Sequence, residues 1–417
     1  LIKKAAATAN KNVKVLDPKI ADALVGACDR ILKGEFADQF VVDMIQGGAG
    51  TSTNMNFNEV MVNVALEAEG HKKGEYQYIH PNDHANLGQS TNDTYPSSIK
   101  VAAVMMIENL LKALDHLTAE LDKKAEAFKD VVKMGRTELE DAVPTTLGNT
   151  FHAFASFIRE DTEHIRKAQD LLKVLNMGAT AIGTGINCHP DYSKEVIRVL
   201  NEETHDCYRN ADDMIAATQD TADYVSVSGA LRSLAVHINK IANDLRWMNS
   251  GPRCGLGEIE LPKMQPGSSI MPGKVNPVIA EVVLISCYQT MGNDLTVTLC
   301  AQRGEFELNG VEPGIAYALF NSIRIMTNAV NTLADKAVAN LKANEDACLK
   351  SVLNSVGIVT AFNPYLGYEK SAGIAKEALQ TGKSVKEICL ERGYMSEAEI
   401  DKILDPRNML NPRMVRG

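Results

Sequence analysis

Aromatic side chains are scarce in this sequence, at 5% of the 417 residues, although 45% of the residues are hydrophobic. The apolar residues are mainly Ala, Leu, Ile, Val and Met, a composition more typical of helices than of sheets. A chain of this length exceeds what a single hydrophobic core usually organises, so two or three domains are expected. The composition therefore predicts a mainly α fold.

Long apolar runs are also missing, and none approaches the roughly 20 residues that a membrane-spanning helix needs. The first residues, Leu1 to Asn10, lack the apolar core of a signal peptide. The eight cysteines include no CxxC pair, which is typical of free thiols in a reducing cytosol. These features predict a cytoplasmic protein with no membrane partner. Because the sequence has no initiator Met, we also expect residues before Leu1 to be missing.

A basic stripe is absent, since 43 Lys and Arg residues are mixed among 53 Asp and Glu residues, for a net charge of -10. Nucleic acid is therefore an unfavourable partner. His80 and His84 are four residues apart, but Pro81 lies in the turn between them, and no residue cluster has convincing metal spacing. The turn at 47–52 lacks the order of a phosphate loop. We expect no metal and no cofactor, and any carboxylate-binding site must be local.

Five stretches between residues 95 and 345 place apolar residues at helical spacing over roughly 22 to 32 residues. These stretches are Ser97 to Phe128, Asn149 to Leu175, Ala222 to Asn249, Val278 to Leu299 and Gly314 to Ala343. The stretch Val278 to Leu299 is apolar on more than one face and must be covered on all sides. We expect a bundle whose outer faces pack on other subunits.

The pattern changes on either side of this central region. Residues 1–92 alternate helical stretches with Gly- and Asn-rich turns, and the helix from Asp17 to Leu32 has clear start signals in Asp17 and Pro18. Residues 347–417 are more polar and contain two short helix-like stretches, Lys383 to Arg392 and Ser396 to Leu404. The sequence predicts three domains: a truncated N-terminal domain (1–92), a central helical bundle (93–346) and a small C-terminal helical domain (347–417).

The segment Gly267 to Pro277 contains two glycines and two prolines in eleven residues, which excludes the interior of a helix or strand. Such a segment can be an ordinary surface loop. It runs into the very apolar helix from Val278, however, and presents Ser268, Ser269, Lys274 and Asn276 on a flexible backbone, as a lid over a site would. Lys274 and the helix N-terminus supply positive potential for a carboxylate.

A second polar group, Ser90, Thr91 and Asn92, precedes the first long helix. Two hydroxyls and an amide near a helix start suit a carboxylate held by neutral donors. The same residue types also form ordinary helix N-caps, so this segment alone leaves both interpretations open.

The residues of these segments together resemble the aspartase/fumarase superfamily. Gly267 to Pro277 matches its signature loop, and the resemblance extends over essentially the whole chain. It includes Gly47 to Ser52, Ser90 to Asn92, Met134 to Thr137, Asp141 to Pro144, Glu307 to Asn309 and Glu312 to Pro313. Fumarases typically carry Ser-Ser-Asn where this chain has Ser90-Thr91-Asn92, and His where it has Glu138. The closer resemblance is to the aspartase branch, which implies reversible elimination of ammonia from L-aspartate to give fumarate.

The resemblance also implies roles for individual residues. Ser268 would be the base, and the dicarboxylate substrate would be lined by Thr51, Ser90, Thr91, Asn92, Thr137, Ser269, Lys274 and Asn276. The family's fold has three domains and a homotetrameric helical core, with each site built from three subunits. Glu138 is either a contact for the substrate's ammonium group or a partner of Arg136 or Lys133. Alternative functions are a fumarate hydratase, a lyase for a larger succinyl conjugate, or a structural protein of the lens-crystallin kind.

Overall fold

A computed structural model describes residues 1–410, and most of them are helical. The prediction of a mainly α fold is confirmed. The helices are α1 (Ile2–Asn12), α2 (Pro18–Leu32), α3 (Thr51–Ala68), α4 (Thr91–Ala127), α5 (Leu147–Leu171), α6 (Tyr192–Thr204), α7 (Met214–Gln219), α8 (Ala222–Met248), α9 (Val278–Ala301), α10 (Glu312–Leu333), α11 (Glu345–Asn354), α12 (Asn363–Leu366), α13 (Tyr368–Thr381), α14 (Val385–Glu391) and α15 (Glu397–Leu404).

The strands are short and form two-stranded pairs. They are β1 (Val132–Thr137), β2 (Glu140–Thr146), β3 (Val174–Leu175), β4 (Arg209–Asn210), β5 (Ile259–Glu260), β6 (Gly304–Glu305), β7 (Leu308–Asn309) and β8 (Lys342–Ala343). The pairs are β1–β2, β3–β4, β5–β8 and β6–β7, of which only β3–β4 is parallel.

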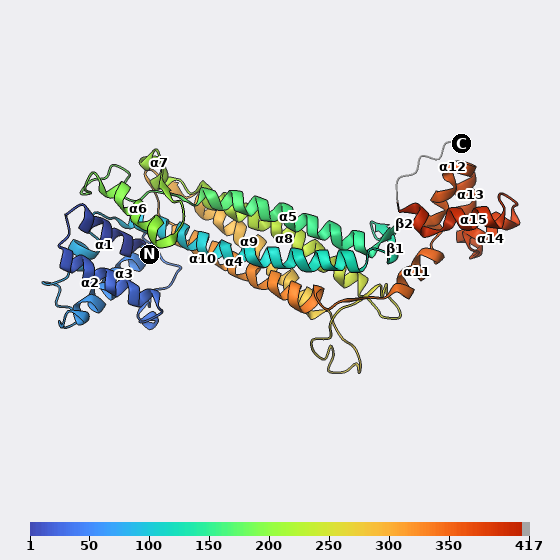
Figure 1. Ribbon diagram of the computed structural model, residues 1–417, viewed down its shortest axis with the longest axis horizontal. Helices are drawn as coiled ribbons and strands as arrows, with labels where there is room; N and C mark the ends of the chain where they lie inside the picture. The colour runs from blue at the N-terminus through green and yellow to red at the C-terminus, as the bar shows by residue number, and fades with distance from the viewer. Residues whose placement is uncertain (411–417) are drawn as a thin grey trace. The chain divides into compact units, whose positions relative to one another are not determined.

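Contacts divide the chain into two compact units, and each long helix contributes to both. The first comprises residues 1–112, 161–236 and 286–328, and the second comprises residues 113–160, 237–285 and the chain from 329 onward. In each unit, segments of α4, α5, α8, α9 and α10 lie side by side (Figure 1). The three predicted domains are a different partition, and they stay a prediction.

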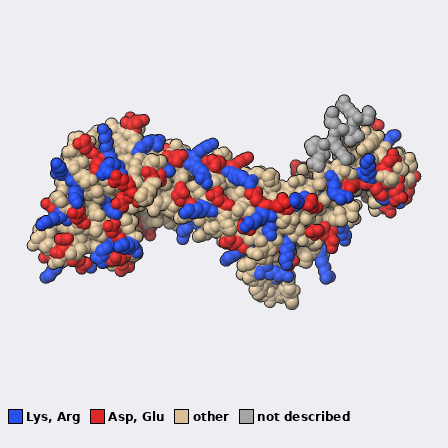
Figure 2. All heavy atoms as spheres, viewed as in Figure 1, with Lys and Arg blue, Asp and Glu red and all other residues tan. Residues whose placement is uncertain are grey.

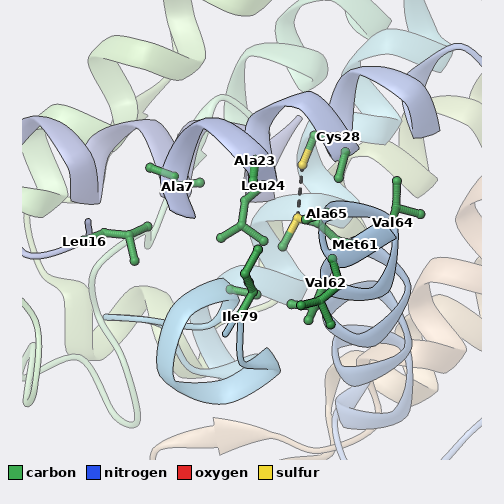
Figure 3. Close-up of a cluster of buried hydrophobic side chains, with 14 residues drawn as sticks. Ala7, Leu16, Ala23, Leu24, Cys28, Met61, Val62, Val64, Ala65 and Ile79 are labelled. Carbon is green, nitrogen blue, oxygen red and sulfur yellow. Dashed lines mark hydrogen bonds between the residues drawn. The ribbon is translucent and has the colours of Figure 1, made fainter. Parts of the chain in front are cut away.

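One hydrophobic cluster of the first unit lies where α2 packs on α3, around Leu24, Met61 and Leu66. Figure 3 shows Cys28 of α2 facing Met61 of α3, with their sulfur atoms 3.1 Å apart. Asp17 caps α2, because its side chain accepts hydrogen bonds from the backbone N–H groups of Lys19 and Ile20. This is the start that the sequence predicts.

The long helices of the first unit are joined by buried polar contacts. The Tyr224 hydroxyl of α8 donates to the Pro96 carbonyl of α4 at 3.0 Å. Asp294 of α9 accepts from Ser228 of α8 at 2.7 Å and from Arg232 of the same helix at 2.7 Å. Each polar atom taken from water in this way has a partner, as burial requires.

In the second unit the hairpin β1–β2 packs with the C-terminal helices around a core that includes Met134, Phe362, Ile388 and Ile400. Helices α14 and α15 begin with capping boxes at Ser384 and Ser396, which confirms the two short helices predicted there.

The surface of the described residues carries both signs of charge over the same elements (Figure 2). No helix within residues 1–410 is long and apolar enough to cross a membrane. All eight cysteines are free, as predicted, and residues 1–410 contain no cluster of three His, Cys, Asp or Glu residues arranged to hold a metal.

Candidate active site

The ten residues predicted for the site fall into two groups, one in each unit. The first unit holds Thr51, Ser90, Thr91 and Asn92, and the second holds Thr137, Glu138, Ser268, Ser269, Lys274 and Asn276.

In the first unit, Ser90, Thr91 and Asn92 lie at the start of α4, and Thr91 is the first helical residue. The Ser90 hydroxyl oxygen accepts from the Asn92 backbone N–H at 3.2 Å, and the Asn92 side chain donates to the Ala181 carbonyl at 2.8 Å. The two interpretations left open by the sequence are therefore compatible. Ser90 acts as a cap-like acceptor while the helix N-terminus leaves positive potential beside the hydroxyls.

Asp93 holds the backbone of this segment in place. Its buried carboxylate accepts backbone N–H bonds from Ser90 at 2.9 Å, Gly178 at 3.1 Å and Thr180 at 3.0 Å. Burial raises the pKa of Asp93 to about 6, although these hydrogen bonds favour the ionised form. Sequence reasoning missed this residue as a site element, because two of its three partners, Gly178 and Thr180, lie 85 and 87 positions further along the chain.

Thr51 is exposed at the first residue of α3, directly after the glycine turn. Its hydroxyl donates to the Gly48 carbonyl at 2.8 Å. Gly50 has a φ of +88°, and a Cβ atom there would lie 2.5 Å from the ring of Tyr95. A glycine is therefore required for the turn to lie on α4.

In the second unit, the segment Gly267 to Pro277 is a loop closed at its base. The Gly267 N–H donates to the Lys274 carbonyl, and the Asn276 side chain donates to the Gly267 carbonyl, both at 2.9 Å. The tip carries Ile270, which is 83% exposed, while Ser269 and Lys274 are also exposed. Helix α9 begins at Val278, one residue beyond the proline that the sequence places at the helix start.

Ser268 is half-buried within this loop. Its hydroxyl oxygen accepts two backbone N–H bonds, from Ile270 at 3.2 Å and from Met271 at 2.9 Å. Two donors aimed at one oxygen stabilise negative charge on it, because hydrogen bonding to a charged form favours that form. A cavity of about 990 Å³ adjoins the base of the loop and is lined by Lys274, Asn276 and Trp247, among others.

Thr137 and Glu138 lie at the tip of the β1–β2 hairpin, and both are exposed. Thr137 pairs with Glu140, and the two intervening residues, Glu138 and Leu139, have φ values of 54° and 69°. Two successive left-handed residues make a tight hairpin turn, a conformation that ordinarily favours glycine or asparagine.

The proposed pairing of Glu138 with Arg136 or Lys133 is not the arrangement found. Arg136 bonds the buried Glu258 through Nη1 at 2.8 Å, and Lys133 Nζ lies 3.5 Å from the other oxygen of Glu258. Glu258 was not singled out from the sequence, since it is 122 positions from Arg136. The carboxylate of Glu138 faces solvent instead.

Comparisons with known proteins identify the family of the chain. A family model described as "Lyase" matches residues 1–292, and one described as "Fumarase C C-terminus" matches residues 358–411. The chain is 52% identical to an aspartate ammonia-lyase of Helicobacter pylori over 99% of this chain and 88% of the relative. It is 48% identical to an aspartate ammonia-lyase of Escherichia coli K12, over 99% of this chain and 86% of the relative.

Solved structures also resemble this chain over nearly its whole length. A fumarate lyase:delta crystallin from Brucella melitensis bound to cobalt matches with a TM-score of 0.95 and 46% identity, covering 99% of this chain and 89% of that one. A class II fumarase from Schistosoma mansoni matches with a TM-score of 0.94 and 33% identity, covering 98% and 88%. Family model, relatives and fold coincide over nearly the whole sequence, and the chain belongs to the aspartase/fumarase superfamily of lyases.

Proposed function

We propose that the protein is an aspartate ammonia-lyase, which eliminates ammonia from L-aspartate to give fumarate, and that Ser268 is its base. The observation that carries the assignment of Ser268 is its pair of backbone N–H donors. A serine hydroxyl is ordinarily a poor base, and these donors stabilise the alkoxide that could accept a proton. Relatives named aspartate ammonia-lyase, at 48–52% identity, support the reaction class.

Ser268 first releases its hydroxyl proton to solvent. In the first step, the resulting alkoxide removes a proton from the β-carbon of aspartate and becomes a hydroxyl again. The electron pair moves into the adjacent carboxylate and gives a dianionic enediolate, whose stability limits the rate. Hydroxyl donors directed at this carboxylate lower the barrier, and loss of one typically costs about 2.7–4 kcal/mol. Ser90, Thr91 and Ser269 are the donors we assign to it, and Thr51 joins them once its hydroxyl turns from the Gly48 carbonyl to the substrate.

In the second step, the electron pair re-forms as the carbon–carbon double bond and the Cα–N bond breaks, so that the ammonium group leaves as ammonia and fumarate remains. Lys274 and Asn276 hold the other carboxylate, through a cation and an amide N–H. Thr137 lines the same site. Glu138 contacts the ammonium group of the substrate, a role supported by its exposure at the hairpin tip while Glu258 occupies Arg136 and Lys133.

A homotetramer completes the site in this proposal, with each site assembled from several subunits. Helix α9 supports a homotetramer, because five of its large apolar side chains are between 47% and 65% exposed. These are Val282, Ile285, Tyr288, Leu295 and Leu299. An exposed apolar stripe on a long helix marks an interaction surface. Further copies of this chain are the partners we assign, together with a reducing, cytoplasmic location that suits eight free thiols.

The test is the absorbance of fumarate formed from L-aspartate, with L-malate assayed in parallel. We expect turnover of aspartate only, and expect Ser268→Ala to lower kcat by about 10²- to 10⁴-fold, the usual contribution of a positioned base. Ser156→Ala is the matched control, since Ser156 is a half-buried serine of α5 whose hydroxyl bonds only the His152 carbonyl in the described structure. Turnover of malate in place of aspartate would make the protein a fumarate hydratase. Full activity of Ser268→Ala would remove Ser268 as the base, and light scattering tests the tetramer.

A further inference from the structure

A buried lysine lies beneath the polar group that begins α4. Lys3, on α1, is 9% exposed, and its Nζ donates to two amide oxygens, Oδ1 of Asn86 at 3.0 Å and Oε1 of Gln89 at 2.9 Å. Burying a cation against neutral partners is unfavourable.

The lysine dictates the orientation of Asn86. A protonated lysine can only donate, so the amide of Asn86 must turn its oxygen toward Nζ and its nitrogen away. The nitrogen accordingly donates to the Gln89 carbonyl at 3.1 Å. The oxygen of Asn86 then also accepts from Nδ2 of Asn54 at 3.2 Å and from Nδ2 of Asn58 at 3.1 Å.

The orientation of Asn54 passes the effect on to the proposed substrate site. Its Nδ2, turned toward Asn86, also donates to Oγ1 of Thr91 at 3.2 Å. The Thr91 oxygen is therefore an acceptor on its inner side. Its hydroxyl hydrogen is left to donate outward, which is what a substrate carboxylate needs.

The arrangement has a visible energetic cost. Asn54 is 5% exposed and Asn58 is fully buried, and among the described residues nothing donates to the Oδ1 atom of either. A buried acceptor without a partner costs about 1–3 kcal/mol. If Asn86, Asn54 and Asn58 all turned over, the nitrogen of Asn86 would satisfy both oxygens. The turned Asn54 oxygen would then accept the Thr91 hydrogen, and the outward donor would be lost.

Protonated Lys3 excludes this reversed set, because its N–H groups would meet the nitrogen of Asn86. Burial lowers the pKa of Lys3 to about 7, while the nearby Asp93 favours the protonated form. The geometry points to Lys3 as a positioning residue that, through Asn86 and Asn54, keeps the Thr91 hydroxyl as a donor to the substrate. This inference rests on the proposed function, in which Thr91 holds a substrate carboxylate. Lys3 does not touch the substrate and acts only through this chain of hydrogen bonds.

A double-mutant cycle tests the inference, with succinate as an unreactive dicarboxylate probe and kcat/KM for aspartate as a second readout. The variants are Lys3→Met, Thr91→Val and the double variant that carries both substitutions. We expect each single variant to weaken succinate binding about tenfold or more, as the loss of a hydrogen bond to a charged group does. The double variant should bind no worse than Thr91→Val alone, because residues that act through one contact are not additive.

Two further variants separate the effect of the N–H donors of Lys3 from the effects of its charge and of side-chain packing on α1. Lys3→Gln keeps two N–H donors without the charge and should restore most of the binding that Lys3→Met loses. Lys4→Met is the matched control, since the neighbouring lysine bonds Glu203 and Asp29 instead, and its succinate binding should equal that of the unmodified protein. If Lys3→Met does not fold, the same cycle is run with Asn54→Ala.

The possible failures are distinguishable. Additive losses in the double variant, with Thr91→Val impaired alone, would overturn the role of Lys3 and leave the proposed function standing. Unchanged succinate binding in Thr91→Val would remove Thr91 from the substrate site, and this inference would fall with it. Equal losses in Lys3→Gln and Lys3→Met would also overturn it, because donor direction would then be irrelevant.

Discussion

The Tm of the variant Glu312→Gln, relative to the Tm of the unmodified protein, should be more favourable at alkaline pH than at acidic pH. Glu312 is the first residue of α10 and is 3% exposed. The charged group facing it is Lys100, which itself bonds Asp223 at 2.8 Å, and the titratable hydroxyls nearby are those of Tyr95 and Tyr224. A carboxyl buried there favours its neutral form, because burial penalises the charge.

The magnitude follows from the two ends of the titration. Burial raises the pKa of Glu312 to about 8 in the folded protein, against an ordinary value of 4.5. Between these values the folded state holds a proton that the unfolded state has released, so the free energy of unfolding falls as pH rises and levels off above about 8. The difference between the two pKa values corresponds to a loss of about 5 kcal/mol in the free energy of unfolding. In a chain of this size that is a shift in Tm of about 5 °C.

Melting curves followed by circular dichroism at pH 5 and pH 9 measure this effect. The Tm of Glu312→Gln relative to the unmodified protein should be about 5 °C more favourable at pH 9 than at pH 5. Glu307→Gln, at an exposed position just before α10, should show no such change between the two pH values. An equal Tm difference at both pH values, or a relative loss at pH 9, would refute the reasoning. The latter would mean that the ionised carboxylate is stabilised by Lys100.

Two further outcomes are expected. Glu258→Gln should lower the free energy of unfolding by about 3–5 kcal/mol in chemical denaturation, because Arg136 and Lys133 would lose their buried charged partner. Glu260→Gln is the control, since this residue is exposed two positions on and its substitution should change the denaturation midpoint little. Glu138→Gln should raise KM for aspartate while leaving the inhibition constant of succinate, which has no ammonium group, unchanged. An unchanged KM would exclude the ammonium contact.

Helices were predictable from this sequence where the signal is local. The Asp17–Pro18 start of α2 and the capping boxes of α14 and α15 are read from neighbouring residues, and the structure has them. The predicted start of the first long helix at Ser97 was six residues late, since α4 begins at Thr91. Pro96 made an earlier start unfavourable, because proline leaves a helical carbonyl without its donor.

The structure supplies that donor from elsewhere. The carbonyl of Asn92, four residues before Pro96, accepts from the side chain of Asn176 at 3.1 Å. Asn176 is 84 positions away, so no local pattern could indicate that the helix tolerates its proline. The same limit applies to Glu258, whose partners Lys133 and Arg136 on β1 were assigned differently from sequence because Glu258 is 122 positions from Arg136.

The residues proposed to touch the substrate could be found from the sequence because their chemistry is unusual in their local context, as with two serines, a lysine and an asparagine between prolines. The residues that orient them have no such signature. Asn54, Asn58 and Asn86 look like ordinary helix or turn residues. Their amides gain a direction only because Lys3 bonds Asn86, which in turn accepts from Asn54 and Asn58. A sequence states which donors and acceptors a site contains. Which way each hydrogen points depends on contacts between residues about 30 to 85 positions apart, and it is this direction that decides whether a hydroxyl can stabilise an anion.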